Sequence, residues 1–99
     1  MNIEEIILHK DQIYRIAAKY HITKVYVFGS IARGESDKTS DADFLIEMEK
    51  GASAFGVGGF QYEVEQLLGI NIDVIPKNVI PDIVDREFVK NINAEAVAL

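Results

Sequence analysis

The sequence predicts an α/β (α+β) sandwich, in which a small mixed β-sheet has helices packed against it. Two segments repeat apolar residues at three- and four-residue steps, the period of an amphipathic helix. Three short runs are apolar and rich in β-branched residues, as strands are. With a last helix near the end, the order is α-β-β-α-β-α. At 99 residues, 48% of them apolar, the chain is expected to form one domain, residues 1–99, with a small core.

The first half of the chain is predicted to contain one long helix and two strands. Residues 3–20 form the helix, whose apolar face comprises Ile3, Ile6, Ile7, Ile13, Ile16, Ala17 and Tyr20. Residues 24–28 (KVYVF) form the first strand, and residues 43–48 (DFLIEM) form the second. Residues 29–40 are rich in Gly, Ser, Asp and Thr, which predicts a loop with room for one helical turn at 31–33.

The second half is predicted to add a helix, a strand and a last helix. Four glycines, which discourage helix, precede the second helix: Gly51, Gly56, Gly58 and Gly59. Its apolar face then comprises Phe60, Val64, Leu67 and Leu68, and Gly69 ends it. Residues 70–76 form the third strand, and Asp82 caps a helix that runs to about Asn91. The final residues, AEAVAL, are either a helix tail or a short edge strand.

Composition narrows the function classes. The absence of cysteine excludes disulfides, thiol catalysis and cysteine-based zinc sites, and His9 and His21 fit no metal-ligand spacing. A formal net charge of −6 argues against binding to duplex nucleic acid or to an anionic membrane surface. It suits a basic protein partner, or an acidic site neutralised by cations. With no visible signal peptide and no apolar run of about 20 residues, we expect a soluble, cytoplasmic protein.

Two aspartates at the start of the second strand need an explanation. Residues two apart in a strand point to the same face, so Asp41 and Asp43 project side by side. Carboxylates that close need protonation, basic neighbours or a divalent cation. Arg33 and Lys38 could neutralise them in a surface ion pair, which is the simpler alternative.

A third aspartate, Asp73, lies in an otherwise apolar strand. It is either buried without a partner, which is costly, or part of a site at the edge of the sheet. Asn71 shares its face, so a hydrogen-bonded structural aspartate is a further alternative. Three acidic residues on neighbouring strands could form an oxygen cage for magnesium, which prefers one or two carboxylates plus substrate phosphates.

The Gly29-Ser30 turn provides features suited to an anion. Glycine lets backbone approach a ligand closely, and a helical turn starting here offers free N–H groups and a positive dipole end. Arg33, three residues on, can grip phosphate oxygens bidentately. The alternative is an ordinary strand-to-loop turn with Arg33 in solvent.

The Gly-Ser turn and the later aspartates together resemble the motif of a known family. The stretch VFGS (27–30), followed after a spacer by DADF (41–44), resembles the signature of the DNA polymerase β-type nucleotidyltransferase superfamily. Within it, nearly the whole chain resembles the minimal nucleotidyltransferases (MNT), small antitoxin partners of HEPN-domain toxins. The likeness includes SIARGES, GGFQYEVEQLLG and INIDVI. It implies a polymerase β-like nucleotidyltransferase core.

The resemblance implies a nucleotide-binding role for three residues. In this family the Gly-Ser pair, here Gly29 and Ser30, binds the triphosphate, and the arginine of the ARG segment, here Arg33, contacts phosphate. The glycines at 56–59 are then either a mobile segment over the nucleotide pocket or a poorly formed helix start.

The resemblance also implies a catalytic and metal-binding role for three carboxylates. The motif aspartates, here Asp41 and Asp43, hold two Mg²⁺ ions, and Asp73 completes the metal site and helps deprotonate the attacking hydroxyl. Two metals can clamp the attacking and leaving oxygens of such a transfer. The implied reaction is AMPylation: AMP passes from ATP to a hydroxyl, expected to be a tyrosine, of a HEPN ribonuclease toxin.

The implied partner and two competing functions complete the sequence-based hypotheses. The resemblance implies the antitoxin of a type VII-like HEPN/MNT toxin–antitoxin system, in a hetero-oligomer with its HEPN-domain toxin. One alternative is a non-catalytic antitoxin that neutralises the toxin by stoichiometric binding. The other is a small-molecule nucleotidyltransferase of the aminoglycoside type, which the length disfavours because such enzymes carry an additional domain for the acceptor.

Overall fold

The computed structural model describes residues 2–32, 34, 42–77 and 96–99. In chain order, its elements are α1 (Ile3–Leu8), α2 (Lys10–Lys19), β1 (Ile22–Phe28), α3 (Gly29–Ala32), β2 (Ala42–Met48), α4 (Phe55–Leu68), β3 (Ile72–Pro76) and β4 (Val97–Ala98). The helix expected after Asp82 lies outside the described residues. The short edge strand, one of the two alternatives for the end of the chain, is confirmed as β4.

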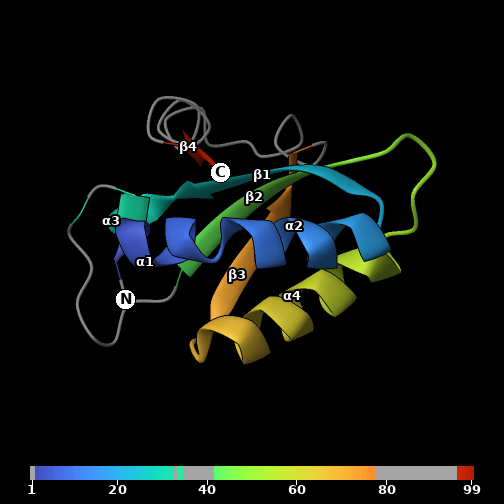
Figure 1. Cartoon of the computed structure of the whole chain (residues 1–99). Helices are drawn as coiled ribbons and strands as arrows, with labels where there is room; N and C mark the ends of the chain where they lie inside the picture. Colours follow the sequence, from blue (N-terminus) through green and yellow to red (C-terminus); the bar gives the residue numbers. More distant parts are fainter. Residues whose placement is uncertain (1, 33, 35–41, 78–95) are drawn as a thin grey trace.

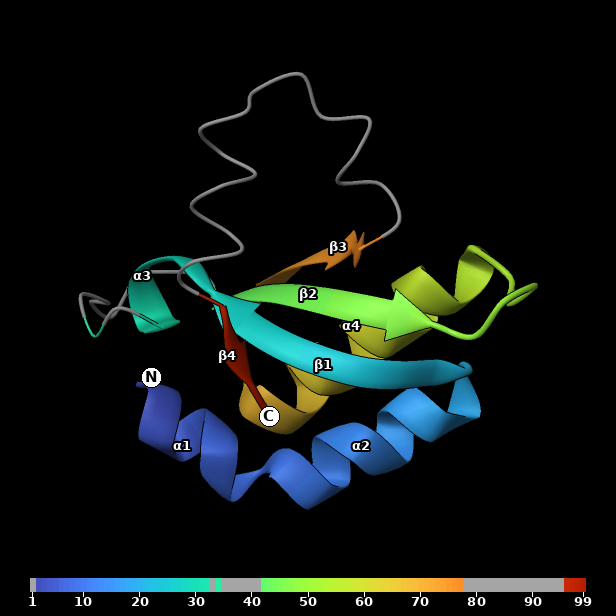
Figure 2. The ribbon, with the colours of Figure 1, turned by 90° about the horizontal axis from the view of Figure 1, so that it is seen from above.

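The described strands form one mixed sheet in the order β3-β2-β1-β4. β1 is antiparallel to both β2 and β4, whereas β2 and β3 are parallel (Figure 2). Helix α4 makes the crossover that a parallel pair requires. A small mixed sheet with packed helices confirms the predicted fold class.

Helices α1, α2 and α4 all lie against one face of the sheet (Figure 1). Because side chains alternate along a strand, Val25, Val27 and Phe44 point to that face and form the main core with the helices. Phe44 meets Phe60 of α4 edge to face, with ring centroids 6.4 Å apart. The opposite face, called the outer face below, carries a smaller apolar cluster: Phe28 and Leu45 with Tyr26, Ile75 and Ala96.

The single helix predicted over residues 3–20 is wrong, because the chain divides it at His9. There the backbone leaves the helical region, with φ −97° and ψ 11°. In a continuous helix the Glu5 carbonyl would accept the His9 N–H. Instead it contacts the His9 ring nitrogen Nδ1 at 2.9 Å, while the His9 N–H donates to Ile6 and Ile7.

The glycine-rich segment is not a poorly formed helix start, because α4 is helical from Phe55. The glycines instead allow α2 to pack closely. A Cβ at Gly59 would lie 2.5 Å from the Tyr20 ring, and one at Gly56 would lie 3.2 Å from Tyr20. Helix α4 ends at Gly69 as predicted, with φ 71°.

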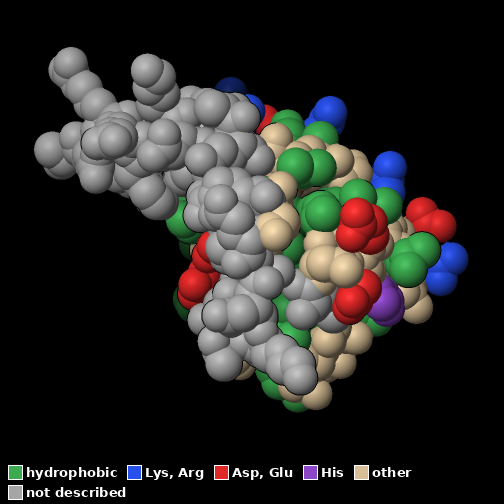
Figure 3. All heavy atoms as spheres, turned by 90° about the vertical axis from the view of Figure 1, so that its left-hand side faces the viewer, with side chains coloured by type: hydrophobic (Ala, Val, Ile, Leu, Met, Phe, Trp, Pro, Cys, Tyr) green, Lys and Arg blue, Asp and Glu red, His purple; other side chains and the backbone are tan. Residues whose placement is uncertain are grey.

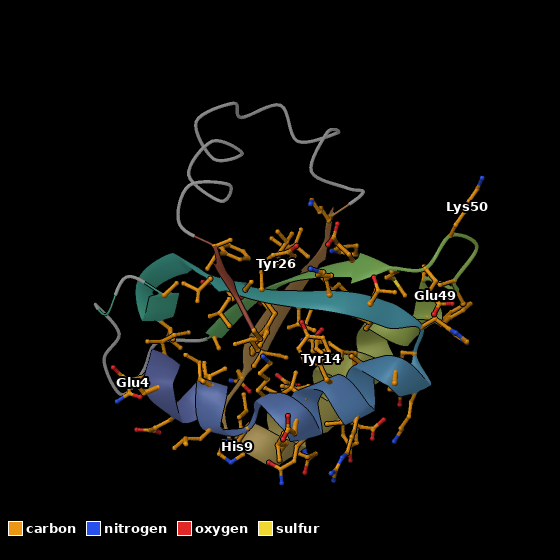
Figure 4. The ribbon with its side chains drawn as sticks, turned by 45° about the horizontal axis from the view of Figure 1, so that its top comes forward. Glu4, His9, Tyr14, Tyr26, Glu49 and Lys50 are labelled. Atoms are coloured by element: carbon orange, nitrogen blue, oxygen red, sulfur yellow. The ribbon has the colours of Figure 1, made fainter. Side chains whose placement is uncertain are left out.

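A tyrosine joins the helix layer, the sheet and the end of the chain. The Tyr14 hydroxyl accepts a hydrogen bond from the Val25 N–H at 3.1 Å and donates one to the Leu99 carbonyl at 3.2 Å. Figure 4 shows this side chain between α2 and the sheet. Within the described ranges, no helix combines the length and the apolar character needed to cross a membrane.

Candidate active site

The predicted site residues that the structure describes meet at one end of the outer face. In the sheet register Phe28 is paired with Asp43, and Asp43 with Asp73. Their strand neighbours Phe44 and Val74 belong to the core on the helix side, so both aspartates project from the outer face. Two carboxylates thus occupy matching positions on strands that run about 4.8 Å apart.

The two aspartates differ in their surroundings. Asp43 is half-buried, whereas Asp73 is exposed on β3, the edge strand of the described sheet. Of the alternatives for Asp73, burial without a partner is therefore wrong; its place on an edge strand fits the alternative of a site there, which stays a prediction. Asn71 also lies exposed, and its carbonyl accepts a hydrogen bond from the Ala42 N–H at 3.3 Å.

Gly29 explains how a helical turn can begin directly beside Asp43. Its φ is +78°, in the left-handed region that favours glycine, and a Cβ there would lie 2.3 Å from Asp43 Oδ2. Any other residue at position 29 would therefore displace the Asp43 carboxylate. Gly29 and Ser30 open α3, which begins two residues before the helical turn predicted at 31–33.

Two of the predicted site residues, Arg33 and Asp41, lie outside the described residues, as does Lys38, the alternative basic neighbour. The phosphate contact of Arg33 and the metal-binding role of Asp41 stay predictions. So do the roles assigned to Gly29, Ser30, Asp43 and Asp73, although the structure brings Gly29, Asp43 and Asp73 together.

Phe28 is a neighbour of this site that sequence reasoning missed. It is the last residue of β1, is only 6% exposed and is paired in register with Asp43. Its ring belongs to the apolar cluster of the outer face, so one side of the Asp43 carboxylate borders apolar surface. Alternation along β1, with Val25 and Val27 facing the core, would have placed Phe28 on the carboxylate face.

The opposite end of the outer face holds a carboxylate in a different setting. Glu47 accepts hydrogen bonds from Lys77 Nζ at 3.1 Å and from the Tyr26 hydroxyl at 3.0 Å. The bond from Lys77, and then that from Tyr26, lowers the pKa of Glu47. The same bond raises the pKa of Lys77. Figure 4 shows Tyr26 on the upper side of the sheet, away from Tyr14.

A hollow of about 590 Å³ adjoins this second end, not the aspartates. It is lined by the ends of β2 and β3, the start of α4 and the turn between β2 and α4, including Glu47, Lys50, Val57 and Lys77. None of the described site residues lines it. Figure 4 shows Lys50 extending from that turn into solvent.

The donor set at the aspartate end suits magnesium. Asp43 and Asp73 provide hard carboxylate oxygens side by side, and Mg²⁺ is usually held by one or two carboxylates together with substrate phosphates. No group of three or more His, Cys, Asp or Glu that could hold a metal occurs within the described part of the chain. The pair thus fits a metal shared with a substrate.

Charge at the end of the molecule that carries α3 is mixed. Figure 3 views this end, and on its described surface acidic side chains (red) and basic side chains (blue) are interspersed. The expectation that the chain binds no duplex nucleic acid stays a prediction.

The sequence matches the family model described as a nucleotidyltransferase domain over residues 6–99. The chain belongs to this family. A Methanocaldococcus jannaschii protein provisionally named a protein adenylyltransferase is 40% identical over 87 residues, which cover 87% of this chain and 90% of that protein. The protein adenylyltransferase MntA of Thermococcus cleftensis is 31% identical over 77% of this chain and 75% of its own length.

Solved structures agree with this nucleotidyltransferase assignment. A structure described as a minimal nucleotidyltransferase matches with a TM-score of 0.80 and 26% identity, covering 100% of this chain and 97% of that one. A tri-AMPylated Shewanella oneidensis HEPN toxin in complex with its MNT antitoxin matches in fold, with a TM-score of 0.63 and 11% identity, over 92% of this chain and 68% of that one. The predicted resemblance to minimal nucleotidyltransferases, and the prediction of a nucleotidyltransferase enzyme, are confirmed.

Proposed function

We propose that this nucleotidyltransferase is an antitoxin that transfers AMP from ATP to a hydroxyl, expected to be a tyrosine, of a partner HEPN toxin in a magnesium-dependent reaction. The observation that carries the proposal is the register pair of Asp43 and Asp73 beside Gly29, in a chain of this family. The two carboxylates repel each other as adjacent like charges. The pair is suited to gathering cations around a triphosphate.

The residues divide into a phosphate side and a carboxylate side. The first N–H groups of a helical turn have no partners within the helix, so the backbone N–H groups of Gly29 and Ser30, at the start of α3, would donate to phosphate oxygens. Asp43 and Asp73, with Asp41, would hold the magnesium, which supplies neutralisation of phosphate charge when bound. Arg33 would add a bidentate contact to a phosphate.

The transfer itself is a displacement at the α-phosphorus of ATP. The acceptor oxygen forms the new bond to phosphorus, the bond to the bridging oxygen of the β-phosphate breaks, and pyrophosphate leaves. The acceptor's proton passes to Asp73, whose exposure on the edge strand lets a partner's side chain reach it. Asp43, held against Gly29, keeps a fixed position and is therefore better suited to positioning than to proton transfer.

The protein acceptor and the toxin partner are supported by the similar proteins. Relatives that are 40% and 31% identical carry names of protein adenylyltransferases. A structural neighbour is an MNT antitoxin in complex with an AMPylated HEPN toxin. A formal charge of −6 also favours association with a basic partner.

A titration endpoint tests catalysis against simple binding. A catalytic antitoxin should silence an excess of HEPN toxin, given ATP, magnesium and time, and the intact mass of the toxin should increase by AMP. Ser30→Ala should slow this neutralisation, and Asp41→Ala should stop it. Neutralisation only at equimolar ratio, with or without ATP and magnesium, would show that the chain acts by stoichiometric binding and that the transferase proposal is wrong.

Calorimetry tests the role of magnesium separately. We expect the chain to bind ATP much more tightly with magnesium than without it, because the paired carboxylates otherwise repel the triphosphate. Asp43→Asn should weaken this dependence on magnesium. Equal affinity under both conditions would contradict the magnesium site.

A further inference from the structure

Two side chains of α4 bind the backbone of β3 directly before Asp73. Gln61 Nε2 donates a hydrogen bond to the Ile72 carbonyl at 3.0 Å, and Glu65 Oε2 accepts one from the Ile72 N–H at 3.0 Å. Because Gln61 and Glu65 are four residues apart, they project from the same face of the helix. Both side chains are half-buried. One residue of β3 thus has both of its backbone polar groups bound by a single helix, α4, which lies beside the start of the strand (Figure 1).

Ile72 is the first residue of β3, the edge strand of the described sheet. An edge strand has a partner strand on one side only, which leaves a row of backbone groups on its other side without strand partners. On the inner side, the Asn71 carbonyl accepts a hydrogen bond from the Ala42 N–H of β2 at 3.3 Å. The N–H and carbonyl of Ile72 bond to α4 instead. Gln61 and Glu65 therefore act on Ile72 as a further strand would.

Asp73 has a position that needs such support. It is exposed and is the second residue of its strand, and the ends of elements open more easily than their centres because fewer contacts hold them. Repulsion from Asp43, its register neighbour, also acts to move it away. A displacement of about 1 Å at a reacting group can lower a rate roughly 100-fold. The contacts of Ile72, which is 2% exposed, are the nearest described anchor of the Asp73 backbone.

We propose that Gln61 and Glu65 are positioning residues for Asp73: by binding both backbone groups of Ile72, they keep the Asp73 carboxylate in register with that of Asp43. This inference rests on the proposed function, in which Asp73 receives the acceptor's proton and helps to hold magnesium. Helix α4 is a suitable support, because its inner side is buried in the core. Side chains held by a packed helix keep a site's geometry better than side chains on loops.

The alternative is that the two bonds serve only the stability of the fold. Loss of either bond leaves a backbone group of Ile72 unpaired and should lower the melting temperature whichever role the bonds have. Stability alone therefore does not separate the two roles, but coupling to Asp73 does. A positioning residue loses its effect once the side chain that it positions has been removed, whereas a residue that acts through the whole fold keeps its effect.

Methionine substitutions on α4 provide the test and its controls. Gln61→Met and Glu65→Met each remove one bond and keep a side chain of similar length, and either variant serves if the other does not fold. Gln66→Met places the same side chain at an exposed position of the same helix, and Glu65→Gln keeps an oxygen that can accept the Ile72 N–H. Well below the melting temperatures, we expect each bond-removing variant to lose about 10-fold in magnesium–ATP affinity and in transfer rate. Both controls should stay within about 2-fold of wild type.

The same substitutions in an Asp73→Asn background decide between positioning and stability. We expect Gln61→Met to change the magnesium–ATP affinity of Asp73→Asn by less than about 2-fold, because the carboxylate that it displaces is already gone. Hydrogen exchange of the Ile72 N–H gives a measure that does not depend on activity. It should be faster in Glu65→Met than in wild type or Glu65→Gln, because only Glu65→Met removes the acceptor.

Three results would overturn the inference, and they are distinguishable. If Asp73→Asn impairs transfer while Gln61→Met and Glu65→Met keep the affinity and rate of wild type, α4 does not position Asp73, and the proposed function stands. An equal fall in magnesium–ATP affinity with and without the Asp73 carboxylate would show that the two side chains act through the fold. If Asp73→Asn transfers AMP as fast as wild type, the role of Asp73 in the proposed function is wrong, and this inference fails with it.

Discussion

The two ends of the outer face use carboxylates in opposite ways. At one end Asp43 is paired in register with Asp73, a second carboxylate on the neighbouring strand. At the other end Glu47, four residues along the same strand, accepts hydrogen bonds from Lys77 and Tyr26. Between them Leu45 is paired with Tyr26 and Ile75, and the row is apolar.

The difference helps to distinguish a carboxylate that binds a ligand from one that makes a structural contact at the protein surface. Glu47 is stabilised by a cation and a hydroxyl, contacts that suffice to explain it as part of the fold. Carboxylates in matching positions on adjacent strands cost free energy, and the chain keeps this arrangement at the end of the sheet where α3 begins. The cost is understandable if the pair binds cations together with a nucleotide.

The largest expected effect comes from removing one charge at each end. Asp43→Asn should lower transfer activity by about 100-fold or more, while the fold stays as stable as wild type or becomes slightly more stable, because the repulsion with Asp73 is relieved. Glu47→Gln should keep activity and lose a little stability. Transfer rate and melting temperature of both variants measure the contrast. A sharp fall in the melting temperature of Asp43→Asn would mean that Asp43 serves the fold.

A smaller effect is expected from two glycines that share a positive φ. Gly29→Ala should destabilise the protein by roughly 2–4 kcal/mol, since it adds an overpacking clash to left-handed strain, and its Cβ would displace the Asp43 carboxylate and lower activity. Gly51, at the other end, has φ +85° and nothing within 4 Å of a Cβ. Gly51→Ala should therefore cost only about 1 kcal/mol and leave activity unchanged. Equal losses of stability and activity in the two variants would contradict the contact between position 29 and Asp43.

The sequence predicted the sheet better than it predicted the helices. Short apolar runs rich in β-branched and aromatic residues identified all three long strands, because such side chains suit a pleated, half-buried surface. The break of the first helix at His9 was missed, since it depends on the ring nitrogen that contacts the Glu5 carbonyl and on no apolar period.

The glycines of α4 show why helix propensity failed there. Propensity gives glycine a cost of about 1 kcal/mol in a helix, but Gly59 lies where any Cβ would clash with Tyr20, the residue directly after α2. That contact joins residues 39 positions apart and has no local signal.

The smallest expected effect is the pH dependence of the Glu47 end. The hydrogen bond from Lys77, and then that from Tyr26, lowers the pKa of Glu47 below its ordinary 4.5. Its contribution to stability is therefore present above that value and is lost as the pH falls through the folded-state pKa. The pKa of Lys77 is raised above 10.5 by the bond to Glu47, so its contribution is full below that pH and is lost only in strong alkali. Both contributions are present at neutral pH, and they are small because the Lys77 side chain is exposed and the Glu47 side chain is only partly buried.

Melting temperatures of wild type and Glu47→Gln between pH 3 and pH 7 measure this loss. Wild type should melt slightly higher at pH 7, and the gap should close as the pH falls below 4.5, because protonated Glu47 no longer attracts Lys77. In a Lys77→Gln background the same Glu47→Gln change should have a smaller effect at pH 7, since its main partner is already gone. If the melting-temperature difference between wild type and Glu47→Gln grew as the pH fell, the ionised Glu47 side chain would be destabilising at neutral pH, as the ionised Asp43 side chain is expected to be. The hydrogen bonds from Lys77 and Tyr26 would then not make Glu47 a stabilising carboxylate, and the contrast with the Asp43–Asp73 end would be lost.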